Sequence, residues 1–435
     1  MLVVTRVLTV SFVLSLTLSR KHVVAQHRQP VKFPNYLPGD HAFHQTDGAL
    51  LLGEYKVDEA YQSILERFEG TGRNLNHEPN SESAKSIYRS RDMKLAGFYY
   101  TFEFKVRADL EQLEYLVANN LGNVTYYTET VIPKLQKLLE RIPSFSELEK
   151  QNRLGMYHFQ KEDFAEGIHE FYNKALYRPN ITAEGIDNLF GESFNPEEIE
   201  TKWFHEDGSE DKEGDLVRGP VIVIDDFFSP EALTRIRNLL LQSTAYFEAK
   251  PPSMLGTYCG AYINDGLNDK ILLEVSDALR KALPRILGEY PLKLLWSYKY
   301  FPEYDLSGRE DYDTGINVHA DNAAVNLNIW LTPDEANLDP DSGGLVVYTV
   351  KPPFNFDYTK YNDARVKNEI LEKSNWENIT VPYKYNRATL FDSALYHKTD
   401  KFQFKTGYEN RRINLTLLFG DPVAVKKNTK KSDEL

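Results

Sequence analysis

The sequence predicts an α+β protein, with helices in its first half and a β-barrel in its second. Apolar residues recur at three- and four-residue steps from about residue 86 to residue 200, which indicates helices. After residue 219, segments that alternate apolar and polar residues indicate strands with one buried face. The 435 residues are enough for two or three domains and a sizeable core.

Residues 1–25 are predicted to be a secretory signal peptide. Arg6 precedes an apolar run over residues 7–18, and small residues follow at 23–25. The run is too short to span a bilayer comfortably, although the basic residues after it leave an uncleaved anchor as the alternative. No later stretch is long and apolar enough for a membrane helix, so we expect no membrane span.

Residues 423–435 form a basic tail that ends in Ser-Asp-Glu-Leu. This tetrapeptide resembles the endoplasmic reticulum retrieval signal, with serine in its first place. Together with the signal peptide, it predicts a location in the endoplasmic reticulum lumen. The net charge of −13 argues against nucleic acid as a partner, whereas basic protein substrates stay open.

Cys259 is the only cysteine in the sequence, so no intrachain disulfide can form and core packing must supply the stability. We expect Cys259 to be a buried apolar residue and not a nucleophile. In the secretory pathway, the sequons at Asn123, Asn180 and Asn378 could carry glycans. The sequon at Asn414 lies in a predicted barrel strand, where we expect no glycan.

Residues 26–205 are predicted to be mainly helical. Residues 26–60 lack periodicity, and we expect them to lie over the surface. Two helical patterns follow, at Leu110, Leu113, Leu116 and Val117 and at Val131, Leu135, Leu138 and Leu139. The segment near 154–180 resembles one tetratricopeptide unit, although solenoids need about three. A helical domain packed on the barrel and a peptide-binding groove are therefore equally supported.

An acidic linker at residues 206–218 marks a predicted domain boundary. Beyond it, residues 221–224 predict a buried strand, and Ser229 and Pro230 predict the start of a helix. A second helix is expected over residues 271–283, before Pro284. The segment 352–386 is long for a hairpin connection, so it either shapes a substrate mouth or covers the fold.

The candidate chemistry begins with His319 and Asp321. They lie two residues apart, so on an extended strand they share a face. Two imidazoles and one carboxylate, with open positions opposite, are how proteins hold Fe(II) for oxygen chemistry. His397, far along the chain, could supply the second imidazole, because a barrel brings distant strands together.

The last predicted strand has one apolar and one polar face. Arg412, Asn414 and Thr416 share the polar face, which should line a cavity, and Arg411 points the other way. A guanidinium inside a pocket favours a bidentate anionic partner, such as a dicarboxylic acid.

Together these motifs resemble the 2-oxoglutarate- and Fe(II)-dependent dioxygenases, most closely their prolyl-hydroxylase-like branch. The resemblance covers residues 219–422 and implies a double-stranded β-helix (jelly-roll) for this oxygenase domain. It implies that His319, Asp321 and His397 bind the iron and form the catalytic centre. It also implies that Arg412 binds the distal carboxylate of 2-oxoglutarate, with Asn414 where the family has a hydroxyl residue.

Three further residues are expected to face inward, and the role of the first, Tyr300, is implied by the resemblance. Tyr300 is expected to donate to 2-oxoglutarate, with aromatic core packing as the alternative. Asn326 and Asn328 share one face of a predicted strand. Their amides either orient a ligand or the metal-binding carboxylate, or they satisfy one another.

The resemblance implies a hydroxylase that uses Fe(II), 2-oxoglutarate and O2, with ascorbate as a further candidate, and that releases succinate and CO2. The expected location makes a secretory-pathway polypeptide the first substrate hypothesis, with proline as the candidate residue. The alternatives are an oxygenase acting on a small molecule, lipid or glycan, and a non-catalytic luminal scaffold that uses the helical half. The sequence does not set the oligomeric state.

Overall fold

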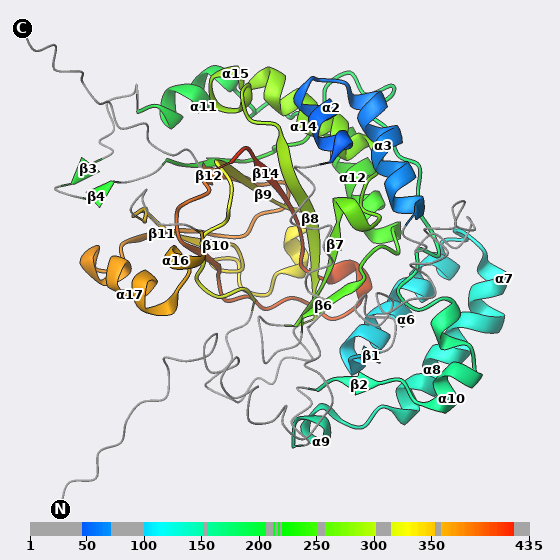
Figure 1. The fold of residues 1–435 in the computed structure, drawn as a ribbon. Helices are drawn as coiled ribbons and strands as arrows, with labels where there is room; N and C mark the ends of the chain where they lie inside the picture. The colour runs from blue at the N-terminus through cyan, green and yellow to red at the C-terminus, as the bar shows by residue number, and fades with distance from the viewer. Residues whose placement is uncertain are drawn as a thin grey trace, which may run out of the picture.

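A computed structural model describes residues 46–70, 100–150, 155–205, 212–213, 216–217, 220–250, 257–301, 315–352 and 358–421 (Figure 1). The predicted signal peptide, the basic tail and most of the acidic linker lie outside these residues. The helices are α2 Asp47–Gly53, α3 Val57–Gly70, α6 Glu103–Ala118, α7 Val124–Tyr126, α8 Ile132–Arg141, α9 Phe145–Lys150, α10 Lys161–Ala165, α11 Pro196–Trp203, α12 Pro230–Gln242, α14 Lys270–Ala282, α15 Pro284–Leu287, α16 Tyr358–Tyr361 and α17 Ala364–Lys373. The strands are β1 Tyr100–Thr101, β2 Tyr157–His158, β3 Lys212–Glu213, β4 Leu216–Val217, β5 Val221–Ile224, β6 Glu248–Lys250, β7 Tyr258–Tyr262, β8 Leu292–Tyr300, β9 Val325–Trp330, β10 Leu345–Tyr348, β11 Asn378–Val381, β12 Ala388–Asp392, β13 His397–Thr399 and β14 Ile413–Phe419.

Two antiparallel sheets make up the second half of the described chain. The larger sheet has seven strands in the order β5-β12-β9-β14-β8-β7-β6, and the smaller has three in the order β11-β10-β13. A β-bridge between His319 and His397 adds the segment around His319 to the edge of the smaller sheet. The prediction of mixed helices and antiparallel sheet is therefore confirmed.

The register of the larger sheet gives it two unlike faces. Thr416 on β14 lies opposite Asn328 on β9 and Trp296 on β8, and residues opposite each other share a face. We call this polar and aromatic side the inner face. Leu415 and Ile329 lie on the other side, the helix-covered face, where α12 and α14 pack (Figure 1). Strands β10 and β11 lie on the inner side, so the two sheets enclose the inner face (Figure 1).

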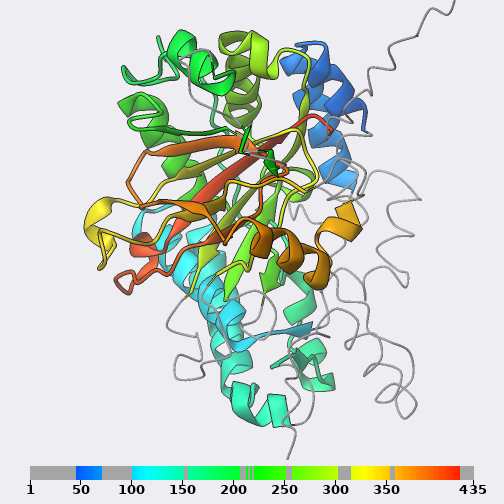
Figure 2. The ribbon, with the colours of Figure 1, turned by 90° about the vertical axis from the view of Figure 1, so that its left-hand side faces the viewer.

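The helices predicted from apolar periodicity are confirmed. The pattern over residues 110–117 lies in α6. The pattern over residues 131–139 begins at the end of a π-helical turn, Tyr127–Val131, and continues in α8. These helices form a core of their own below the sheets (Figure 2). Ser229 caps α12 by accepting from the Ala232 N–H at 3.4 Å, and α14 ends at Ala282, two residues before Pro284. None of the described helices combines the length and apolar composition that crossing a membrane requires.

Two expectations for the first half were not met. Residues 155–180 show no tetratricopeptide-like unit, because they form β2, the short helix α10 and a 3-10 turn, Ile168–Glu170. Gly167, at φ 74°, turns the chain out of the helical path there. The surface expectation was wrong for residues 47–53 and 57–60, which belong to α2 and α3. Helix α3 buries Ala60, Ile64 and Phe68, one stripe four residues apart, and contacts α14.

Cys259 lies on β7, and its partner Lys299 on β8 places it on the helix-covered face. It is buried, and burial raises the pKa of its thiol to about 12. The thiolate is therefore scarce at neutral pH, which agrees with a packing role.

Candidate metal centre

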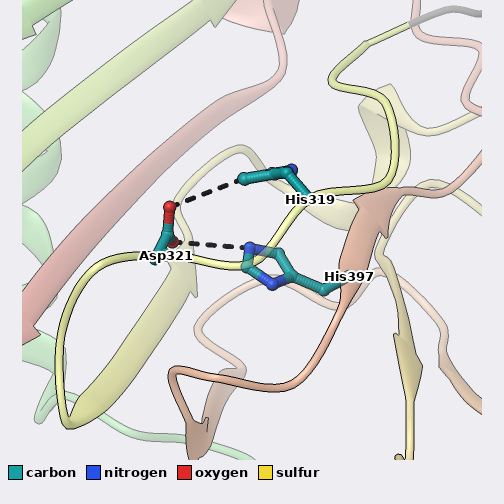
Figure 3. Close-up of side chains that lie close together, drawn as sticks. All are labelled: His319, Asp321 and His397. Carbon is teal, nitrogen blue, oxygen red and sulfur yellow. Dashed lines mark ion pairs between the residues drawn. The ribbon is translucent and has the colours of Figure 1, made fainter. Parts of the chain in front are cut away.

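The structure brings His319, Asp321 and His397 together, with the carboxylate facing both imidazoles (Figure 3). The Nε2 atom of His319 lies 3.6 Å from Asp321 Oδ1, and that of His397 lies 3.5 Å from Oδ2. Two ligands on one ion, with bonds of about 2.1 Å, lie roughly 3–3.5 Å apart. These three groups can therefore hold a metal ion.

Backbone pairing joins the two ligand segments although they are far apart in the sequence. The N–H of His319 donates to the carbonyl of His397 at 3.0 Å, and the N–H of His397 donates to the carbonyl of His319 at 2.7 Å. Further along, the N–H of Asp321 donates to the carbonyl of Ser393 at 3.1 Å. His319 and Asp321 thus lie on a short added strand beside residues 393–397.

Each histidine is oriented by a carbonyl two residues before it. His319 Nδ1 lies 2.7 Å from the carbonyl of Asn317, and His397 Nδ1 lies 3.0 Å from that of Leu395. A carbonyl only accepts, so Nδ1 carries the hydrogen and Nε2 keeps its lone pair. Burial, and next the neighbouring His397, lower the pKa of His319 to about 4, so its ring is neutral at pH 7. The ligand atoms of the two rings and of the carboxylate therefore face one point.

Asp321 stays ionised because its surroundings favour the charged form. Burial raises its pKa, but the two imidazoles and the Asn326 amide outweigh burial and lower it on balance. Asn326 Nδ2 donates to Asp321 Oδ2 at 2.7 Å, and Asn328 Nδ2 donates to Asn326 Oδ1 at 2.6 Å. The Thr416 hydroxyl donates to Asn328 at 2.8 Å, and Asn414 donates to that hydroxyl at 3.1 Å.

This row of polar side chains crosses the inner face from β14 to the metal centre. Every donor in it points towards Asp321, so each bond polarises the next in the same sense. The two alternatives for the asparagines both hold, because Asn326 orients the carboxylate while the rest satisfy one another.

Arg412 and Tyr300 lie next to each other, just before β14 and at the end of β8. The guanidinium of Arg412 is buried and donates to the carbonyls of Gly343 at 2.8 Å and Gly344 at 3.2 Å. Its carbon lies 4.9 Å from the centre of the Tyr300 ring. Gly344 must lack a side chain, since a Cβ there would collide with the carbonyl of Val381.

Arg412 is a buried cation whose hydrogen-bond acceptors are neutral. Within the described ranges we find no ion pair for it, whereas Arg411 turns away and binds Glu111 of α6 at 2.6 Å. Burial lowers the pKa of Arg412, which shows that its charge is costly without a partner. An anionic ligand would remove that cost.

Tyr300 fits both of its expected roles. Its ring packs in an aromatic group, 5.4 Å from that of Tyr258 and 5.2 Å from that of Phe402 between ring centres. Its hydroxyl belongs to the same surroundings as the Arg412 guanidinium, and burial raises its pKa, so it is a donor at neutral pH.

Comparison with known proteins adds limited information. The sequence matches no model of a protein family, and no curated protein matches it. Among solved structures, it is similar to an oxidoreductase of the 2OG-Fe(II) oxygenase family from Burkholderia pseudomallei, at 14% identity and TM-score 0.29, covering 47% of this chain and 86% of that one. A prolyl hydroxylase from Trichoplax adhaerens, bound to a peptide fragment of hypoxia inducible factor, shows 12% identity and TM-score 0.30, covering 52% and 90%. HygX from Streptomyces hygroscopicus, with nickel and 2-oxoglutarate bound, shows 14% identity and TM-score 0.29, covering 46% and 82%.

These identities and TM-scores assign the chain to no family. The geometry of the candidate metal centre and of Arg412 therefore carries the functional proposal.

Proposed function

We propose that this protein is an Fe(II)- and 2-oxoglutarate-dependent dioxygenase whose metal ligands are His319, Asp321 and His397. One observation carries the proposal: two imidazoles with fixed Nε2 lone pairs and one ionised carboxylate meet at a single point. This set of two histidines and one carboxylate suits Fe(II) and leaves positions for other ligands. The buried Arg412 supports 2-oxoglutarate as one of them.

The residues of this chain would have distinct tasks. Bound Fe(II) and 2-oxoglutarate would supply the oxidative chemistry that places a hydroxyl on a C–H bond, with succinate and CO2 as co-products. Arg412 would bind the distal carboxylate of 2-oxoglutarate through its guanidinium, and the Tyr300 hydroxyl would donate to the same ligand. Asn326 would hold the Asp321 carboxylate in place. The two facing antiparallel sheets fit a double-stranded β-helix around this centre.

We further propose a secretory-pathway polypeptide as the substrate, hydroxylated at proline, in the endoplasmic reticulum lumen. The predicted signal peptide and the Ser-Asp-Glu-Leu end support this location. The side chains of Asn123, Asn180 and Asn378 are exposed, as glycan attachment requires, while Asn414 is buried.

The experiment is a turnover assay of the purified full chain with Fe(II), 2-oxoglutarate, O2 and ascorbate. Proline-containing peptides of secreted proteins are compared with small-molecule, lipid and glycan acceptors, and succinate and a 16-Da mass gain are measured. We expect succinate with peptide hydroxylation, and neither with His319→Ala. Hydroxylation of only a non-peptide acceptor would overturn the polypeptide as the substrate class. The absence of succinate under every condition would favour the scaffold alternative.

A further inference from the structure

The segment between β10 and β11 packs directly behind the metal-ligand strand. Helices α16 and α17 lie on the same side of the molecule as β10 and β11 (Figure 1). Tyr361 and Leu371 from this segment share a small core with Ala320, which stands between two proposed ligands, and with Tyr396, which precedes the third. Ala320 and Tyr396 have no exposed surface. The segment thus contacts both ligand-bearing stretches from behind.

Asn362, between α16 and α17, pairs with the backbone of Ala320. The Ala320 N–H donates to Asn362 Oδ1 at 2.9 Å, and Asn362 Nδ2 donates to the Ala320 carbonyl at 2.9 Å. On a strand, successive residues direct their backbone groups to opposite edges. His319 pairs with His397 on one edge, so the groups of Ala320 point to the other. The Asn362 amide therefore pairs with this edge as a neighbouring strand would.

Two more contacts come from the same segment. Lys367 Nζ donates to the carbonyl of Val318 at 2.6 Å, on the same strand edge as Ala320. The Tyr396 hydroxyl donates to the carbonyl of Tyr361 at 2.7 Å, next to His397. Residues 361–367 thus bind backbone groups of the His319 segment and the Tyr396 side chain beside His397.

We propose that Asn362 is a positioning residue of the metal centre: it fixes the strand of His319 and Asp321 from its open edge, and Lys367 assists it. The inference rests on the proposed metal-binding function. Without the Asn362 amide, a buried N–H and a buried carbonyl lose their partners, and the strand must shift to satisfy them. A shift of the backbone at Ala320 moves both flanking ligands at once. Residues behind metal ligands typically change metal affinity about 10- to 100-fold.

The test is a Co(II) titration of the purified full chain, followed by visible absorption, for wild type and Asn362→Ala. Asn386 offers a matched control, because its amide makes the same paired bonds to the backbone of Phe228, at 2.9 and 2.8 Å. Asn386 also has φ 61°, so Asn386→Ala adds backbone strain and loses at least as much stability. Thermal unfolding without metal compares the stabilities of the two variants.

We expect Asn362→Ala to bind Co(II) about tenfold more weakly and with an altered spectrum. Asn386→Ala should bind like wild type. The proposal would be overturned if Asn362→Ala had the Co(II) affinity and spectrum of wild type. It would also be overturned if Asn386→Ala lost as much Co(II) affinity as Asn362→Ala. If Asn362→Ala does not fold, Lys367→Met is measured in its place. We expect this variant to bind Co(II) more weakly than wild type, and unchanged Co(II) affinity would overturn the proposal. Wild-type protein that binds no Co(II) would overturn the metal centre itself.

Discussion

Two neighbouring buried arginines on opposite sides of the seven-stranded sheet have different partners: Arg411 forms an ion pair, whereas Arg412 binds neutral carbonyls. On the helix-covered face, Lys299 donates to the Tyr408 hydroxyl at 2.6 Å and lies 3.9 Å from the centre of the Tyr246 ring. Nearby, Arg411 pairs with Glu111 at 2.6 Å. On the inner side, three electron-rich ligand atoms converge, and the buried guanidinium of Arg412 binds neutral carbonyls.

Two carboxyl groups with little exposed surface, Asp269 and Asp321, also differ between the two sides. Asp269 precedes α14, in the helical layer, and burial raises its pKa to about 7 despite the nearby Arg178. The Asp321 side chain is 13% exposed, and although partial burial raises its pKa, its neighbours lower it on balance. Asp269 in the helical layer is therefore about half protonated at pH 7, whereas Asp321 at the metal centre stays ionised. An ionised carboxylate beside two imidazoles is a set of groups that suits a bound metal ion.

The largest expected effect comes from removing a ligand. His397→Ala should weaken Co(II) binding about 1000-fold, since structural zinc sites with four ligands yield about 10–16 kcal/mol, or up to about 4 kcal/mol per ligand. Competition with a metal-binding dye measures the affinity. Circular dichroism checks that the variant keeps the wild-type fold. Near wild-type affinity in a folded variant would remove His397 from the centre.

In the helical layer, the raised pKa of Asp269 should make the free energy of unfolding depend on pH. The expected effect is similar in size to the loss of one metal ligand. Its folded pKa of about 7 lies above the ordinary 3.8, about three units at 1.36 kcal/mol each, or on the order of 4 kcal/mol. Because the folded pKa is raised, this stability is present below about pH 4 and is lost as pH rises through 7. Relative to Asp269→Asn, wild type should therefore become less stable from pH 4 to pH 8 in urea unfolding. A constant difference between the two proteins would show that Asp269 is ionised throughout.

Arg412→Lys should weaken the binding of 2-oxoglutarate without changing the binding of the metal. Lysine cannot keep the guanidinium fork, so 2-oxoglutarate should bind about 10- to 100-fold more weakly, the loss of one charge-assisted hydrogen bond of about 1.5–3 kcal/mol. Calorimetry with the Co(II)-loaded protein measures this affinity, and the Co(II) affinity should match wild type. Unchanged 2-oxoglutarate binding would place its carboxylate elsewhere.

The smallest effect is expected for Lys299→Met on the helix-covered face. Burial lowers the pKa of Lys299 well below its usual range, and methionine fills a similar volume without that cost. The Tyr408 hydroxyl keeps its bond to the Leu241 carbonyl at 2.6 Å. We expect the free energy of unfolding to change by less than about 1.5 kcal/mol, with metal binding unchanged. A loss of metal affinity here would contradict the separation of the two faces.

Strand alternation and helix capping made much of the fold and of the candidate site predictable from the sequence. The alternation of side chains along a strand placed Arg412, Asn414 and Thr416 on one face and Arg411 on the other, and the pairings agree. The same rule put His319 and Asp321 on one side. Capping chemistry at Ser229 set the start of α12.

What could not be predicted depends on contacts between distant segments. Asn362 carries no local signal, because its role comes only from pairing with Ala320 across the fold. The segment near 154–180 does not form the expected tetratricopeptide unit, because Gly167 turns the chain after the short helix α10. Helix α3 was not predicted, because its apolar stripe is short and the helix is stabilised by packing against α14.

The central claim is that His319, Asp321 and His397 share one metal ion. The most direct measurement is the stoichiometry of Co(II) or Fe(II) binding to the purified full chain, together with its ligand set by X-ray absorption at the metal edge. We predict one ion per chain with two imidazole ligands, and none in the His319→Ala, His397→Ala double variant. No uptake by wild type, or uptake that survives in the double variant, would contradict the account.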